Sequence, residues 1–311
     1  MTRIIFMGSP EFALPTLEML AKQYDVVGVY TQPDRPAGRG QQLTPPAVKQ
    51  WATEKELPVF QPRTLRDQAV QGQLAELSPE VVVVAAFGLI LPKFVIELPP
   101  RGCINVHASL LPKYRGAAPI HAAILNDDAR TGITLMRMDE GLDTGPLIEQ
   151  ASLAIEPDET FGTLTTELAD LGGRMLDKML PRWLAGDIMP QAQDHSQATL
   201  APKLNKADER LDWTRSAIEL DRRVRALSPK PGTFTTWNGK LVRVISAQVA
   251  GHAPGAPGAP GLVVKDGKDI GVIVGDGILR LVEIQPEGKR VMNTADFARG
   301  QPSFVGSTLG S

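Results

Sequence analysis

Cysteine is almost absent from this chain of 311 residues, which contains a single one, Cys103. One cysteine cannot form a disulfide within the chain and cannot by itself hold a structural zinc ion. Long apolar runs are also missing: the longest, 81–92, has twelve residues, whereas crossing a bilayer takes about 20. Near the start, Ile4–Met7 is too short for a signal-peptide core and leads directly into Gly8. We therefore expect a cytoplasmic protein with no membrane segment and no metal.

Two common nucleotide-binding motifs are absent as well. The chain contains no Walker sequence, and the turn after its first apolar segment reads Gly8-Ser9-Pro10-Glu11-Phe12 instead of G-x-G-x-x-G. A proline and a glutamate in that turn would receive a pyrophosphate poorly. The sequence therefore argues against a nucleotide cofactor at this position.

Charge is nearly balanced over the whole chain, at −2, but it is unevenly distributed. Residues 1–202 contain 17 Lys and Arg against 24 Asp and Glu, and residues 203–311 contain 16 against 11. The basic excess lies in 203–245, where ten basic residues face five acidic ones. This pattern fits either a solvated basic face or a surface that binds a polyanion, and charge alone leaves both open.

Strand and helix patterns alternate through the first half of the chain. Strand, helix, strand, repeated, predicts an α/β fold with a doubly wound, mostly parallel, Rossmann-like sheet. A long amphipathic helix follows, with Thr160 as its N-cap and with Pro181 disturbing or ending it. The predicted strands are 3–7, 25–30, 81–86, 103–107 and 133–138, with helices near 65–77 and 118–126.

The last third of the chain changes to short alternating strands. Asn238-Gly239 and Asp276-Gly277 both suit type I′ hairpin turns, and Ser216 is a suitable cap for a short helix. Several short strands of this kind predict a small OB-like β-barrel. We therefore expect an α/β domain over 1–188, a linker over 189–206 and the OB-like domain over 207–311.

The most concentrated polar residues follow the strand predicted at 103–107. Asn105 and His107 lie on one side of it because side chains alternate along a strand, and Ser109 comes next. Ligands of open α/β sheets bind beyond the carboxyl ends of the strands. Asp143, in the loop 138–145, can reach back to His107. The combination suits acyl transfer: Asn donates to a developing oxyanion, His moves a proton and Asp orients the imidazole.

Other roles for these residues have less support. A lone histidine near a strand end is most often structural. Ser109 with His107 and Asp143 lacks the G-x-S-x-G turn of a hydrolase triad. Cys103 with His107 lacks the further ligands of a metal site. The remaining histidines have no comparable surroundings: His121, His195 and His252.

Five ordered segments resemble the signatures of folate-dependent formyltransferases. The most specific is 103–120, which reads CINVHASLLPKYRGAAPI. The resemblance extends over nearly the whole chain and includes a basic barrel at the C-terminus. It implies that 1–188 is the catalytic domain and 207–311 a tRNA-binding domain. The other four segments are 3–13, 31–40, 87–92 and 138–145.

Within this superfamily the resemblance is to the enzymes that act on methionyl-tRNA. It implies transfer of the formyl group of 10-formyltetrahydrofolate to the α-amino group of methionyl initiator tRNA, for translation initiation and without a metal. It also implies catalytic roles for Asn105, His107 and Asp143. The folate-binding residues that it implies are Ser109, Leu110, Leu111 and Pro112, with Phe87, Gly88 and Leu89 in the wall of the pterin pocket.

The same resemblance implies two regions that contact the tRNA. One is the loop 31–50 with Arg35 and Arg39, although Gln41-Gln42 stands where many members have paired lysines. The other is the basic region 203–245, which then supplies the rest of the electrostatic attraction. Its proposed contacts are Arg222, Arg223 and Arg225.

Two other functions fit the same three catalytic residues. A formyltransferase acting on an amino sugar nucleotide would not need the basic loop 31–50 or the basic stretch 203–245. A formyltetrahydrofolate hydrolase usually has a further N-terminal regulatory domain, and here the sheet begins at Arg3. A non-enzymatic RNA-binding protein would leave Asn105, His107 and Asp143 unexplained. A monomer is the simplest expectation for the assembly state.

Overall fold

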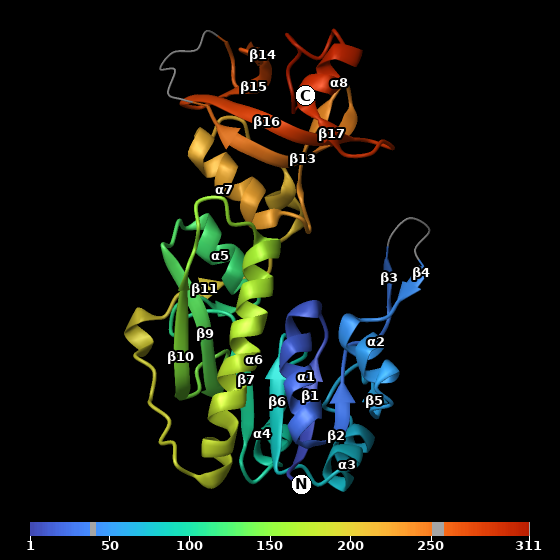
Figure 1. The fold of residues 1–311 in the computed structure, drawn as a ribbon, viewed down its shortest axis with the longest axis vertical. Helices are drawn as coiled ribbons and strands as arrows, with labels where there is room; N and C mark the ends of the chain where they lie inside the picture. Colours follow the sequence, from blue (N-terminus) through green and yellow to red (C-terminus); the bar gives the residue numbers. More distant parts are fainter. Residues whose placement is uncertain (38–41, 251–257, 311) are drawn as a thin grey trace. The chain divides into compact units, whose positions relative to one another are not determined.

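The computed structural model describes residues 1–37, 42–250 and 258–310 (Figure 1). These residues form two compact units. The first unit contains 1–119, 130–154 and 165–202, and the second contains 120–129, 155–164 and the chain from 203 onward. Residues 189–202 of the predicted linker thus belong to the first unit. Arg39 and His252 lie outside the described residues.

The first unit is built on a seven-stranded sheet with the order β10-β9-β7-β6-β1-β2-β5 (Figure 1). Five neighbouring strands are parallel to one another: β7, β6, β1, β2 and β5. Strands β9 and β10 are antiparallel to their neighbours and lie at one edge of the sheet. The predicted doubly wound, mostly parallel α/β sheet is confirmed. The strands are β1 (Arg3–Gly8), β2 (Asp25–Tyr30), β5 (Val59–Phe60), β6 (Val81–Ala85), β7 (Cys103–His107), β9 (Arg130–Arg137) and β10 (Leu147–Ala154).

The central strands have no polar face. Residues Ile4–Met7 of β1 are completely buried, and all of β6 is buried. A parallel sheet is covered by helices on both faces, so its inner strands are apolar at consecutive positions. The chain winds outward from β1 in both directions, to β2 and to β6, and the edge at the carboxyl ends of these strands is where such sheets bind ligands.

The other described elements before residue 210 are helices, short 3-10 turns and two small strand pairs; residues 120–125, 161–164 and 206–209 of these belong to the second unit. The strand pairs are β3 (Arg35–Ala37) with β4 (Gln42–Thr44), and β8 (Arg115–Gly116) with β11 (Leu200–Ala201). The helices are α1 (Leu14–Gln23), α2 (Ala47–Glu54), α3 (Gln68–Glu76), α4 (Lys93–Glu97), α5 (Pro119–Leu125) and α6 (Phe161–Ala185), with short 3-10 turns at Glu11–Ala13, His195–Gln197 and Lys206–Glu209.

Helix α6 begins as predicted and ends later than predicted. The backbone N–H of Thr163 donates to the Thr160 hydroxyl at 3.2 Å, which makes Thr160 the cap. Pro181 lies inside the helix, which continues to Ala185. Of the two effects expected of Pro181, disturbing or ending the helix, the second is wrong, because Leu176 and Leu180 are fully buried and keep this stretch packed. None of the described helices has both the length and the apolar character needed to cross a membrane.

The second unit contains an antiparallel sheet of six strands, in the order β12-β13-β16-β15-β14 with β17 on β16. The predicted separate antiparallel β domain is confirmed. Helix α7 packs against β13 and β16, and α8 against β15 and β16. The elements are α7 (Ala217–Leu227), β12 (Thr233–Trp237), β13 (Lys240–Val249), β14 (Val263–Asp266), β15 (Asp269–Val274), β16 (Gly277–Pro286), β17 (Met292–Asn293) and α8 (Thr294–Gly300).

The local signals of this unit were read correctly at two places and wrongly at one. Ser216 caps α7 in a capping box with Glu219, and Asn238-Gly239 has positive φ at both residues, as a type I′ turn requires. The second predicted turn is displaced by one residue. Val274 pairs with Gly277, so the turn residues are Gly275 and Asp276 instead of Asp276-Gly277.

Contacts with the chain before α7 explain this displacement. A Cβ on Gly275 would lie 2.3 Å from the carbonyl oxygen of Thr214, so only glycine allows the approach. The Asp276 carboxylate accepts from the backbone N–H of Ala217 at 2.8 Å. Both residues are therefore selected by tertiary contacts and not by the turn type.

Candidate active site

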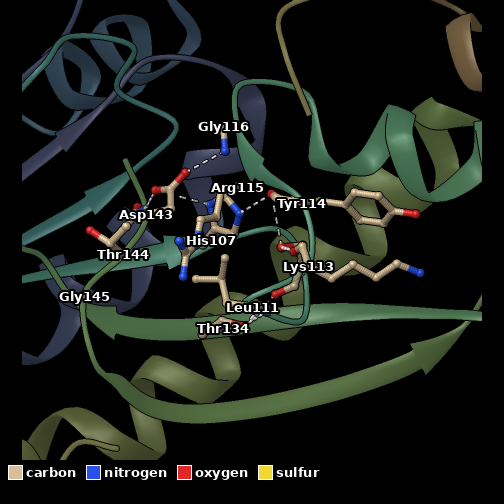
Figure 2. Close-up of polar contacts among 12 residues, drawn as sticks. His107, Leu111, Lys113, Tyr114, Arg115, Gly116, Thr134, Asp143, Thr144 and Gly145 are labelled. Carbon is tan, nitrogen blue, oxygen red and sulfur yellow. Dashed lines mark hydrogen bonds and ion pairs between the residues drawn. The ribbon is translucent and has the colours of Figure 1, made fainter. Parts of the chain in front are cut away.

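The three predicted catalytic side chains meet at the carboxyl end of β7, and Figure 2 shows two of them, His107 and Asp143. Nδ2 of Asn105 donates to Oδ1 of Asp143 at 3.4 Å, and Nδ1 of His107 lies 3.8 Å from the same oxygen. Asn105 and His107 are 9% and 6% exposed, so this cluster is mostly shielded from water. The structure brings the three residues together, and their catalytic roles remain a prediction.

Asp143 lies in a loop that follows an antiparallel strand and must return to the site. Strand β9 is antiparallel to β7, and its last residue Arg137 pairs with Ile104, near the start of β7. The loop 138–146 must therefore return along the sheet to the carboxyl end of β7. Asp143 has a φ of 51°, and a Cβ on Gly145 would lie 1.8 Å from the carbonyl oxygen of Arg137. The loop thus depends on glycine at position 145 and on a left-handed backbone at position 143.

A backbone N–H orients the carboxylate. Oδ2 of Asp143 accepts from Gly116 N at 2.8 Å (Figure 2). This leaves Oδ1 toward Asn105 and His107. Gly116 lies on β8 with a φ of 116°, and a Cβ there would lie 2.8 Å from the carbonyl oxygen of Ala201 on β11. Only glycine allows this close pairing, so the short β8–β11 pair is part of the site's support.

The His107 ring is oriented by its other nitrogen. Nε2 lies 3.0 Å from the carbonyl oxygen of Tyr114, which can only accept, so Nε2 carries a hydrogen (Figure 2). Nδ1 is then the nitrogen on the side of Asp143. Tyr114 has a φ of 64°, and its N–H donates to the Thr199 hydroxyl at 2.9 Å, which holds the carbonyl in this unusual position. A proton can be exchanged with the site only through Nδ1.

The predicted folate-binding segment 109–112 is held by its backbone. The Thr134 hydroxyl donates to the carbonyl of Ser109 at 2.6 Å and accepts from Leu111 N at 3.0 Å. Gln150 donates to the carbonyl of Leu111 at 2.8 Å. The Ser109 hydroxyl is itself turned inward, to the carbonyl of Lys113 at 2.6 Å. Sequence analysis missed Thr134, although a threonine inside the apolar run of β9 was a usable signal.

The other predicted folate-binding segment, 87–89, lies partly in the core and partly at the surface. The Phe87 ring is 2% exposed and belongs to the apolar core with Met7 and Leu91. Its carbonyl accepts from Gln32 Nε2 at 2.9 Å. Gly88 is exposed with a φ of 78°. This segment therefore presents its backbone at Gly88 to the surface, while the Phe87 ring is packed inside; the pterin-wall role stays a prediction.

Four of the arginines predicted to bind tRNA lie among the described residues, and each of these four has an intramolecular partner. Arg35 is exposed on β3, and its guanidinium donates to Gln32. On α7 each of the three donates within the second unit. Arg222 pairs with Asp127, Arg223 donates to the carbonyl of Asp208 at 2.7 Å, and Arg225 contacts Asp221 at 2.8 Å and the carbonyl of Glu159 at 3.1 Å.

Sequence analysis missed two buried polar residues beside the site. Arg115 is 7% exposed and Gln193 is 6% exposed. Gln193 lies in the predicted linker, where the polar composition indicated a loop without further function. Arg115 stands within the segment 103–120, next to residues that attracted attention for their chemistry. The burial of these two side chains could not be predicted, because nothing in the sequence indicates which polar residues of a loop become buried.

Cys103 is buried in the core, and His121 is packed against an aromatic ring. Burial raises the pKa of the Cys103 thiol to about 12, and its sulfur donates to the carbonyl of Val95. Burial lowers the pKa of His121 to about 4, and its ring stacks on Phe161. Over the described ranges, no three His, Cys, Asp or Glu side chains are grouped to hold a metal ion.

Two family models match the chain. The model of the formyl transferase family matches residues 2–180, and that of the formyl transferase C-terminal domain matches residues 203–302. A protein of Myxococcus xanthus named methionyl-tRNA formyltransferase is 50% identical over 306 residues, which is 98% of this chain and 97% of the relative. A protein of Methylococcus capsulatus with the same name is 47% identical over 310 residues, 99% of this chain and 100% of the relative.

Among solved structures, the fold is similar to that of an N-formyltransferase from Helicobacter canadensis in complex with folinic acid and dTDP-3-aminofucose. The TM-score is 0.67 at 19% identity, and the match covers 92% of this chain and 100% of the other. At this identity the likeness concerns the fold alone.

Proposed function

The chain belongs to the formyl transferase family, and on that premise we propose that it transfers a formyl group from a folate to the α-amino group of methionyl-tRNA. The observation that carries this function is the convergence of Asn105 and His107 on one oxygen of Asp143, in a chain whose full-length relatives are named methionyl-tRNA formyltransferases. The donor is 10-formyltetrahydrofolate, and the acceptor is the initiator tRNA.

The reaction needs an acceptor for one proton and a donor for one oxyanion. The amine nitrogen attacks the formyl carbon, a C–N bond forms, and the carbonyl electron pair moves to oxygen. The second N–H of the Asn105 amide and a protonated His107, through Nδ1, donate to that oxyanion. Asp143 receives the ammonium proton, directly or through water. Collapse of the tetrahedral intermediate breaks the bond to N10 of the folate, and N10 leaves with the proton that Asp143 received.

The burial of the site supports this assignment. With Asn105 and His107 nearly inaccessible, water is partly excluded, and the two N–H donors act in a medium of low polarity, where they stabilise a developing charge more than they would in water. Gly116 N keeps the carboxylate oriented before substrate arrives, so the site needs little reorganisation during the reaction.

The acceptor distinguishes this function from its closest alternative. The Helicobacter canadensis protein is described with an amino sugar nucleotide and shares the fold at low identity. The relatives with 50% and 47% identity carry the methionyl-tRNA name over essentially the whole chain, including the C-terminal unit. We therefore propose methionyl-tRNA, and not an amino sugar nucleotide, as the acceptor.

A transfer assay tests the proposal. Purified protein is incubated with 10-formyltetrahydrofolate and charged initiator methionyl-tRNA, beside a charged elongator tRNA and dTDP-3-aminofucose as alternative acceptors. Formylation of the initiator tRNA alone is the expected result. Formylation of the sugar, or release of formate without any acceptor product, would contradict the tRNA function. Activity after extensive chelation would support a reaction without a metal, and a monomeric mass in solution would support the predicted monomer.

A further inference from the structure

Gln193 lies between the two segments that match the family models, at residues 2–180 and 203–302. Both the nitrogen and the oxygen of its side-chain amide form hydrogen bonds. Nε2 donates to the carbonyl of Asp143 at 2.8 Å and to the carbonyl of Gly145 at 2.7 Å. Oε1 accepts from the Arg115 guanidinium, at 2.6 Å from Nη2 and 3.2 Å from Nε. A primary amide has two N–H donors and one oxygen, so its hydrogen-bonding capacity is well used.

Gln193 binds the loop 138–146, whose backbone conformation needs stabilising contacts. Asp143 has positive φ, and Gly145 approaches the backbone of Arg137 closely. Residues in sparsely populated conformations persist only where their surroundings stabilise them. The two N–H groups of Gln193 donate to the carbonyls on both sides of Thr144, so they fix the part of the loop from which the Asp143 side chain projects.

The surroundings of Gln193 are also fixed, by backbone pairings before and after it in the chain and by a further contact of Arg115. Two residues earlier, Gln191 pairs with Leu147 through hydrogen bonds of 2.7 and 2.8 Å. Several residues later, β11 pairs with β8, which contains Arg115 and Gly116. Arg115 also lies 2.9 Å from Nδ1 of His195 through its Nη2. The side chain of Arg115 thus orients Gln193, while the N–H of the next residue, Gly116, orients the carboxylate of Asp143.

We propose that Gln193, oriented by Arg115, is a positioning residue for the transfer reaction: it holds residues 143–145 so that the Asp143 carboxylate faces Asn105 and His107. This inference rests on the proposed function. Gln193 acts through Asp143 and touches neither substrate. Displacement of a reacting group by about 1 Å can cost about 10²-fold in rate, so a loosened loop lowers kcat without removing any catalytic atom.

The sharpest test replaces one atom. Gln193→Glu puts a carboxylate oxygen opposite the carbonyls of Asp143 and Gly145, while its other oxygen keeps the Arg115 contact. The matched control is Gln191→Glu, which adds the same charge two residues away on an exposed side chain. We expect Gln193→Glu to lower kcat by about 10- to 100-fold, with KM for both substrates within about twofold, and Gln191→Glu to retain kcat. A kcat within about twofold of wild type would overturn the proposal.

A double-mutant cycle separates positioning from general damage. In the Asp143→Asn background, Gln193→Glu should cost less than about threefold further, because the group that it positions has already been removed. Full additivity would mean that Gln193 acts elsewhere. If Gln193→Glu does not fold, as judged by thermal melting, Gln193→Ala replaces it in both measurements.

Hydrogen exchange distinguishes a failure of this inference from a failure of the proposed function. Faster exchange over 138–146 in Gln193→Glu, and not in Gln191→Glu, supports the positioning role whatever the acceptor is. Unchanged exchange overturns it. Absence of formyl transfer to methionyl-tRNA by the wild type would instead refute the proposed function and leave the loop result to decide the role of Gln193.

Discussion

Asn105 and His107 are two positions apart on a strand, and Arg223 and Arg225 are two positions apart on a helix. On β7 this spacing places both side chains on one face, and both approach the same oxygen of Asp143. On α7 it separates the side chains by about 200°, and the guanidiniums contact the carbonyls of Asp208 and Glu159. The same spacing therefore concentrates chemistry on a strand and disperses it on a helix.

The two regions also use charge differently. At the β7 site one carboxylate serves two neighbouring groups, and a backbone N–H keeps it oriented. On α7 each arginine has an acceptor of its own within the second unit, so its charge also supports the fold. A count of basic residues in a segment does not reveal how much of that charge is available to a polyanion. Substitutions in the two regions should therefore act differently, on turnover at the β7 site and on stability at α7.

The Asp143 carboxylate is expected to be the most sensitive group. Asp143→Asn keeps the shape but removes the acceptor for the amine proton, so kcat should fall by about 10²–10⁴-fold. Folate binding, followed by isothermal titration calorimetry, should change little. Turnover within tenfold of wild type would mean that Asp143 is not the proton acceptor.

The Asn105 amide is expected to come next. Asn105→Ala removes one oxyanion donor and should lower kcat by about 10²–10³-fold in single-turnover measurements. Asn105→Asp, which places an acceptor where a donor is needed, should be at least as slow. Near-normal turnover in Asn105→Ala would remove the oxyanion role and leave the residue as a support for Asp143.

On α7 the expected effect is on stability. The Arg225 side chain is 17% exposed and has two acceptors, so Arg225→Ala should lower the free energy of unfolding by about 1–3 kcal/mol in urea titrations. Its effect on KM for tRNA should be smaller than that of Arg35→Ala, a change at an exposed position in the first unit. The reverse order would show that Arg225 binds tRNA despite its intramolecular contacts.

The cap of α7 should give the smallest effect. Ser216→Ala removes an N-cap and should cost about 1 kcal/mol in thermal or urea unfolding, with kcat unchanged. Hydrogen bonds from Ser216 hold the pKa of Glu219 below its usual value. Because this pKa is lowered on folding, the stabilisation is present above the ordinary pKa of the carboxyl and is lost as the pH falls through the lowered one. The difference between Ser216→Ala and wild type should shrink over that acidic range.

Much of the fold could be predicted because its signals are local. The apolar runs of β1 and β6 follow from burial on both faces, and the caps at Thr160 and Ser216 follow from hydrogen bonds within one turn. Pro181 and Asp276-Gly277 misled the prediction because packing outside the segment decided the outcome at both places.

Local patterns in the sequence were enough to predict the central strands, the order of the two units and the residues on one face of β7, because strand alternation is a property of the backbone. Only the tertiary structure decided how Asp143 reaches them, since β9 runs antiparallel and its loop must return along the sheet. It also decided that Gln193, distant in sequence and set among polar residues, lies buried against that loop. Such pairings depend on which segments the fold brings together, and no local pattern encodes them.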